Sequence, residues 1–190
     1  MKPHPWAMPI VLIVNLAVAA SIAAQPASAP SATGAAAANS SATTLTAADR
    51  DFLIQVGVDG MAEVEMGKLA QQHGSSAKVK QFADRMVQDH GMANSELKAL
   101  AASKNVTLPA TLPKAQQDDL AQMAKLSGAS FDKAYSLHMV GDHQKAVATF
   151  DKQAKGSGDA QVKAFATKTL PTLREHLAVA KTLDAGAAPK

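Results

Sequence analysis

The chain has 190 residues, a length that allows one domain of ordinary size with a hydrophobic core. Charged residues make up 18% of the chain and aromatic residues 4%, and alanine is abundant, a composition that favours packed helices over a sheet. The formal charge of +3 is too small to predict binding to nucleic acid, and the absence of cysteine excludes disulfides, thiol nucleophiles, iron–sulfur clusters and lipid-modified cysteine anchors.

Residues 1–24 predict a secretory signal peptide. Lys2 precedes an apolar run that begins near Met8, and small residues around Ala23 and Ala24 suit a cleavage site. The run is shorter than the roughly 20 residues that a membrane-spanning helix needs. An uncleaved leader is the alternative, and it would be the only membrane anchor. We expect an exported protein in the periplasm or cell envelope of a Gram-negative bacterium.

The rest of the chain predicts a linker, one domain and a tail. Residues 25–45 are nearly all Ala, Ser, Thr, Pro and Gly without charge, which is typical of a flexible linker. Residues 46–184 predict a helical bundle, and residues 185–190 a disordered tail. Within the bundle, Thr46 and Asp49 resemble a capping box that starts the first helix, which ends at Gly74.

The later helices follow from turn and breaker residues. A second helix is predicted over 76–104, where Pro109 and Pro113 prevent its continuation. A short helix over 114–126 and a long one over 130–155 come next. The last helix begins after Asp159 as N-cap, and Pro171 predicts a kink or a restart inside it. Two hairpins joined by a long crossover predict an all-α, ferritin-like four-helix bundle with a short extra helix in the crossover.

An acid stands directly before a histidine in three of the predicted helices. Each of these histidines lies on the apolar stripe of its helix, and a lone glutamate lies on the stripe of the first helix. At 1.5 Å rise per residue, all four positions fall at similar depth, within about one helical turn. The candidate metal ligands are therefore Glu63, His90, His143 and His176.

The preceding acids are candidates for a supporting role. Adjacent residues point about 100° apart on a helix, so an acid cannot readily bind the same ion as its own histidine. We expect each acid to accept the ring N–H of a histidine on a neighbouring helix, which orients an imidazole that binds metal. These candidates are Asp89, Asp142 and Glu175.

Two interpretations of this layer remain open. One carboxylate and three imidazoles suit Zn and would also take Cu, Fe or Mn. Alternatively, the same residues form a metal-free polar layer that fixes the register of a structural or stress-related module of the cell envelope. The sequence identifies no catalytic residue and no protein partner. His138 lies off the main stripe and is expected at the surface.

An enzyme of the di-iron carboxylate type is not expected. Such bundles carry a Glu-x-x-His pair on each of two helices. No histidine of the predicted helices has an acidic residue three positions before it. A ferroxidase or oxygenase centre of that pattern is therefore excluded.

Five segments together resemble a known family. They are "DRDFL" (49–53), "GMAEVEMGKLA" (60–70), "FADRMVQDH" (82–90), "FDKAYSLHMVGDHQKAV" (131–147) and "LPTLREHL" (170–177). In this order they are similar to the bacterial ferritin-like domain-of-unknown-function family 4142, whose members are often labelled exported or outer-membrane proteins. The resemblance covers about residues 45–184. It implies a ferritin-like bundle and export, and it supplies no established activity.

Overall fold

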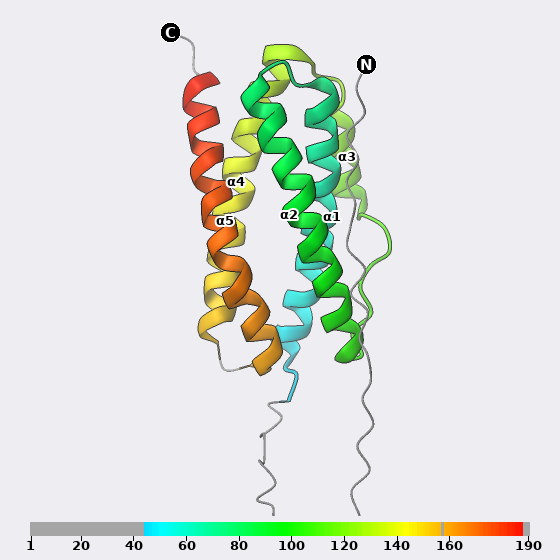
Figure 1. The fold of residues 1–190 in the computed structure, drawn as a ribbon. Coiled ribbons are helices and arrows are strands. Elements are labelled where there is room, and N and C mark those ends of the chain that lie inside the picture. Colours follow the sequence, from blue (N-terminus) through cyan, green and yellow to red (C-terminus); the bar gives the residue numbers. More distant parts are fainter. Residues whose placement is uncertain (1–43, 157, 188–190) are drawn as a thin grey trace, which may run out of the picture. The chain divides into compact units, whose positions relative to one another are not determined.

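The fold is seen in a computed structural model, which describes residues 44–156 and 158–187 (Figure 1). The predicted leader, residues 1–24, lies outside the described residues, as does almost all of the predicted linker. The described residues contain five helices and no strand, and none of these helices is long and apolar enough to cross a membrane. The helices are α1 (Ala47–His73), α2 (Ala77–Ser103), α3 (Lys114–Met123), α4 (Gly128–Lys155) and α5 (Ala160–Ala187).

The long helices form two antiparallel hairpins. Helix α1 packs mainly against α2, and α4 mainly against α5 (Figure 1). Helix α3 lies in the crossover between the hairpins and contacts α1 and α4. The crossover returns the chain to the other end of the bundle, so α2 and α4 run in the same direction (Figure 1). The predicted all-α bundle with a short crossover helix is confirmed, while its ferritin-like classification stays a prediction.

Most helix ends follow the predicted signals. Thr46 and Asp49 form a full capping box, with Thr46 Oγ1 accepting from Asp49 N at 3.1 Å. Asp159 caps α5 by accepting from the backbone N–H groups of residues 161 and 162. Helix α3 ends at Met123, before the expected boundary at 126, and α4 begins two residues early. Helix α5 extends to Ala187, so the start of the predicted disordered tail is helical.

Of the two outcomes predicted at Pro171, a kink or a restart, the restart does not occur, because α5 continues through Pro171 as one helix. Proline lacks the N–H that would bond to the carbonyl four residues earlier, a loss that usually costs about 3 kcal/mol inside a helix. Pro171 faces solvent, where water can satisfy that carbonyl. Its neighbours Leu170 and Leu173 are buried in the core, and this burial holds the helix in place.

Small residues allow α1 and α2 to approach closely. A Cβ atom added at Gly60 would lie 2.0 Å from Asn94 Oδ1, and one at Gly67 would lie 2.8 Å from Val87 Cγ2. Both distances are shorter than a real contact, so Asn94 would have to turn aside at Gly60, whereas at Gly67 the carbonyl oxygen of Ala83, 3.2 Å away, resists any movement. Gly60 and Gly67 therefore lie where α1 and α2 pack closely.

Buried aspartates join the two hairpins at both ends of the bundle. At one end Asp49, which is 1% exposed, accepts hydrogen bonds from Gln153 Nε2 at 2.6 Å and from Asp159 N at 2.9 Å. At the other end Asp132 accepts from the backbone N–H of Ser75 and of Ser76 in the α1–α2 turn. Each aspartate therefore ties the start of one hairpin to the turn of the other.

The hydrophobic core is divided into two clusters. One contains Met66 and Met86 near the α1–α2 turn, and the other contains Leu97 and Phe150 near the α4–α5 turn. On each long helix, the core residues on one side of a polar position belong to one cluster, and those on the other side belong to the other cluster. Those positions are Glu63, His90, His143 and His176. A polar layer thus separates the two halves of the core.

Candidate metal centre

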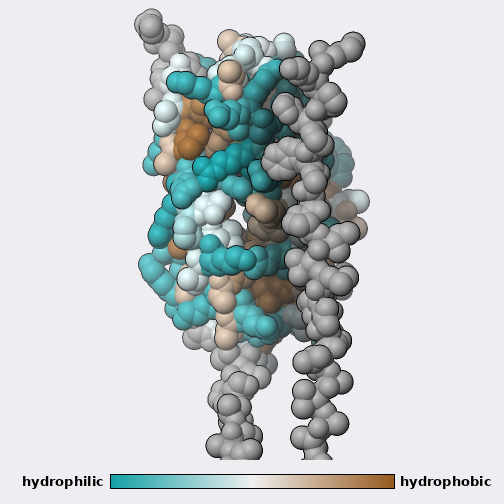
Figure 2. All heavy atoms as spheres, viewed as in Figure 1, coloured by the Kyte–Doolittle hydropathy of each residue, from teal (hydrophilic) through white to brown (hydrophobic). Residues whose placement is uncertain are grey.

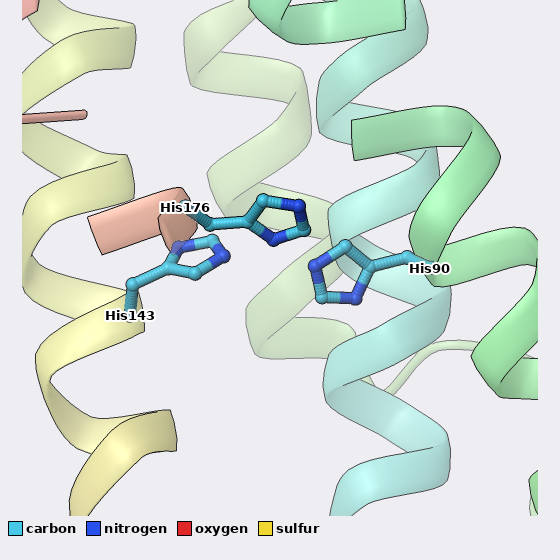
Figure 3. Close-up of side chains that lie close together, drawn as sticks. All are labelled: His90, His143 and His176. Atoms are coloured by element: carbon cyan, nitrogen blue, oxygen red, sulfur yellow. The ribbon is translucent and has the colours of Figure 1, made fainter. Parts of the chain in front are cut away.

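Three histidines from three helices converge in this layer. His90 comes from α2, His143 from α4 and His176 from α5, and their rings point toward one another (Figure 3). The ring centroids lie 5.3–5.7 Å apart. One ring nitrogen of each lies within 4.8 Å of the other two. The α-helical period places each side chain inward, because each occupies the apolar stripe of its helix.

Hydrogen bonds fix the protonation of two rings. His143 Nδ1 lies 3.0 Å from the carbonyl oxygen of Met139, which can only accept, so Nδ1 carries the proton. His176 Nε2 lies 2.8 Å from Asp89 Oδ2 and donates to that carboxylate. The lone pairs therefore lie on His143 Nε2 and His176 Nδ1, and both of these atoms are free to bind a cation.

Three of the four remaining ring nitrogens are buried without a partner among the described residues. Among the described residues, His90 Nε2, His143 Nε2 and His176 Nδ1 are inaccessible to solvent and make no hydrogen bond. A buried polar atom left unpaired costs about 1–3 kcal/mol. Three such atoms in one small region are unusual for a layer that serves only packing, and an ion that accepts their lone pairs would remove this cost.

The surroundings keep the imidazoles neutral. Burial, together with the neighbouring imidazoles, lowers the pKa of His90 to about 3 and that of His143 to about 4. Burial also lowers the pKa of His176, although the hydrogen bond to Asp89 opposes this shift. Neutral imidazole is the form that binds metal. All three side chains are thus ready to bind an ion at neutral pH without losing a proton first.

Asp89, on α2, accepts the hydrogen bond from His176, on α5. Arg85 extends this contact outward: its Nε lies 3.2 Å from Asp89 Oδ2, and its Nη2 lies 2.6 Å from Glu175 Oε2. Burial works against ionisation of Asp89, but the hydrogen bonds from His176 and Arg85 outweigh it and lower its pKa. Asp89 is therefore a carboxylate that orients His176.

The other two acids differ from expectation. Glu175 is exposed and pairs with Arg85, so it reaches His176 only through Arg85 and Asp89. Asp142 lies 2.9 Å from His138 Nε2, one turn earlier on the same helix, and 3.4 Å from Lys145. Neither acid holds one of the three histidines. For Asp142 the reason is helix geometry: side chains four residues apart on one helix, such as His138 and Asp142, lie on the same face and meet readily.

Glu63 does not join the three histidines in the structure. Its Oε1 lies 4.0 Å from His143 Nδ1, the nitrogen that faces the backbone rather than the centre, and its Oε2 has no partner among the described residues. Burial raises its pKa to about 8, and the charges of Asp142 and Asp59 add to this. In the absence of a cation, Glu63 is therefore a neutral acid at pH 7, beside the centre rather than in it.

A large cavity opens beside the centre. Its volume is about 910 Å³, and its walls include Glu63, His90 and His143 as well as residues of all five helices. The space-filling view also shows a hollow between α2 and α5 (Figure 2). The two hairpins are joined at their ends by Asp49 and Asp132, which leaves the middle of the bundle less tightly closed.

Sequence patterns did not identify three residues of this region. Arg85 orients Asp89, and its position four residues before that acid on one helix face was the available signal. His138, expected at the surface, is half-buried and lines the cavity. Tyr135 is fully buried, its hydroxyl has no partner among the described residues, and burial together with Glu63 raises its pKa. No sequence signal separates Tyr135 from an ordinary core aromatic.

Two solved structures share the fold. A DUF305 fragment from Deinococcus radiodurans matches with a TM-score of 0.66 and 11% sequence identity, covering 74% of this chain and 97% of its own. A putative spore coat protein from Bacillus halodurans C-125 matches with a TM-score of 0.59 and 16% identity, covering 77% and 92%. At these identities the likeness concerns the fold alone.

Sequence comparison identifies the family. No curated protein matches the chain. Residues 34–183 match the family described as "Domain of unknown function (DUF4142)", and this range covers the predicted bundle except for its last residue. The chain therefore belongs to the DUF4142 family, as its sequence segments indicated.

Proposed function

We propose that this protein is an exported helical bundle whose core binds one transition-metal ion through His90, His143 and His176. The observation that carries the proposal is the set of three buried ring nitrogens without partners, on side chains whose ligand atoms lie within 4.8 Å of one another. The neutral state of the imidazoles and the orientation of His176 by Asp89 support it further. Export is inferred from the composition of residues 1–24.

The chemistry of the imidazole ligands limits which metal ions the site can bind. Imidazole nitrogens suit Zn and Cu, and also Fe or Mn, whereas Ca and Mg prefer oxygen ligands. Nitrogens bound to a tetrahedral Zn at about 2.0–2.1 Å lie about 3.3 Å apart. The present spacing is at most 4.8 Å, so each pair must approach by no more than about 1.5 Å. The spacing is therefore compatible with a bound Zn ion.

Metal titration of the full chain tests the proposal. We expect one ion per chain, with dissociation constants for Zn or Cu of about micromolar or tighter. Replacing the three histidines by alanine should weaken binding at least about 100-fold. His73→Ala is the matched control, because His73 lies on α1 and stacks on Phe131 outside the group. Failure of the full chain to bind any of Zn, Cu, Fe or Mn at this level would exclude the proposal.

The metal-free alternative makes a different prediction for stability. If the layer only fixes the register of a structural module, His90→Ala should lower the free energy of unfolding of the apo-protein by about 1–3 kcal/mol through lost contacts. If the layer binds metal, the same change removes an unpaired polar atom and leaves apo stability nearly unchanged, while metal affinity falls. Chemical denaturation with and without Zn separates the two.

A further inference from the structure

The cavity beside the three histidines has an apolar interior and a polar mouth. Its deep walls contain the buried side chains of Met66, Phe150 and Leu173. Its rim contains the exposed residues Asp59 and Asp119, from α1 and α3. A volume of about 910 Å³ is within the range of pockets that hold small organic molecules.

The cavity reaches the proposed metal ligands. His90 and His143 line it, and both carry a buried ring nitrogen without a partner. An ion held by three protein ligands keeps a further coordination position, which is the arrangement of Zn sites that bind water or substrate. Glu63 lines the same cavity, is only 8% exposed and has an unpartnered carboxyl oxygen. It offers a hydrogen bond to a molecule bound there.

The charges around the cavity select the type of molecule. Besides Glu63, the acids that line the cavity are Asp59, Asp119 and Asp142. The basic residues that line it are Lys145 and His138, and His138 pairs with Asp142. The acidic rim opposes the approach of an anion. The apolar walls favour an organic group that can be buried against them.

We propose that this cavity binds a small, uncharged organic molecule whose nitrogen or oxygen donor completes the coordination of the ion held by the three histidines. The inference rests on the proposed metal site and adds a ligand class to it. The metal site would then be an open one, which keeps a coordination position for a further ligand, rather than a closed structural one.

Cobalt-loaded full-length protein provides the test, because the visible spectrum of Co(II) reports its ligands. The probe is 4-phenylimidazole, which is uncharged at about pH 8 and combines a nitrogen donor with an apolar ring. We expect it to change the cobalt spectrum and to bind at least about tenfold more tightly than imidazole, because its ring is buried. Benzoate, an anion of similar size, should leave the spectrum unchanged.

Two substitutions on α4 provide a matched pair. Ala146 lines the cavity, whereas Ala148 is exposed and does not line it. Ala146→Phe should still bind cobalt, but it should weaken the binding of 4-phenylimidazole at least about tenfold because the larger side chain fills the cavity. Ala148→Phe should behave as the wild type. Ala93→Leu fills the cavity from α2 and repeats the test if Ala146→Phe does not fold.

The negative results of this experiment can be told apart. A protein that takes up no cobalt contradicts the metal site itself, and the ligand proposal with it. A cobalt spectrum that 4-phenylimidazole does not alter overturns the ligand proposal alone. Equal affinity in Ala146→Phe and the wild type also overturns it, because the probe would then bind outside the cavity.

Discussion

At the scale of single residues, the orientation of His176 by Asp89 is the contact on which the proposed site depends most. Because Nε2 of His176 donates to Asp89 at 2.8 Å, the lone pair is held on Nδ1. Arg85 holds Asp89 in turn. Such supporting carboxylates usually contribute about 10–100-fold to metal affinity.

Asp89→Ala should therefore weaken Zn binding by about 10–100-fold without abolishing it, because the three imidazoles remain. Competition with a chromophoric chelator measures the change. Asp84→Ala is the control, since Asp84 lies on the same helix but is exposed and bonds Gln71. Equal affinities for the two variants would mean that Asp89 does not orient a metal ligand.

Glu63 gives a pH dependence of stability that can be measured in the metal-free protein. Its pKa of about 8, against 4.5 ordinarily, means that the folded state keeps a proton that the unfolded state has already released. Stability must then fall as pH rises between these values. Relative to Glu63→Gln, the wild type should lose about 1 kcal/mol per pH unit from pH about 5 to 8.

Denaturant unfolding across this pH range measures the effect, and the difference between variant and wild type removes the contribution of other groups such as His138. Glu65→Gln is the control, because Glu65 is exposed on the same helix and pairs with Lys68. If the curves for wild type and Glu63→Gln run parallel, Glu63 is not a neutral buried acid.

The sequence could predict which helix faces carry the histidines of the site, but not the contacts that the surrounding side chains make. The positions of His90, His143 and His176 follow from the 3.6-residue period, which places them on core faces. Periodicity does not give rotamers or partners across helices. For this reason the sequence alone could not show that Asp142 turns to His138, or that Glu63 lies 4.0 Å from the backbone-facing nitrogen of His143.

At the scale of helices, α1 and α2 pack closely because the contact contains glycine, which has no side chain. Gly67→Ala would place a Cβ 2.8 Å from Val87 Cγ2 and 3.2 Å from the carbonyl oxygen of Ala83, and the backbone atom cannot move aside. We expect the free energy of unfolding to fall by about 1–3 kcal/mol. Thermal and urea unfolding measure it.

The control for this change is Gly141→Ala. Apart from its own stretch of helix, no atom of the described residues lies within 4 Å of a Cβ at Gly141, so the added methyl group meets no neighbour there. The higher helix propensity of alanine should then stabilise the protein by about 0.5–1 kcal/mol. Equal effects at the two glycines would contradict the close approach of α1 and α2.

Helix number and order could be predicted from caps and breakers, whereas the behaviour of α5 at Pro171 could not. A proline can be seen in the sequence, but its effect on a helix depends on its surroundings. The carbonyl that loses its hydrogen bond must face water, and neighbours such as Leu170 and Leu173 must be buried. Both depend on packing, which the sequence pattern does not specify.

At the scale of the whole bundle, the hairpins are joined at their ends and separated by a polar layer and a cavity in the middle. Asp49 joins one end by hydrogen bonds to Gln153 and Asp159. Burial disfavours its ionisation, but these hydrogen bonds and those from Thr46 outweigh it and lower its pKa. The stability that Asp49 contributes should therefore be present at neutral pH and lost as pH falls below about 4.

Asp49→Ala should lower the free energy of unfolding by about 3–5 kcal/mol at neutral pH, because it leaves buried donors of both hairpins unpaired. Asp51→Ala is the control on the same helix, since Asp51 is exposed. Denaturant unfolding compares the two. A similar small effect of both substitutions would show that Asp49 does not join the hairpins.

X-ray absorption spectroscopy of the zinc-loaded full chain can show whether an ion binds to three imidazoles in the layer between the two core clusters. We expect three imidazole ligands at about 2.0–2.1 Å, with one of them lost in His90→Ala. A zinc spectrum without imidazole scattering, or one unchanged by His90→Ala, would contradict it.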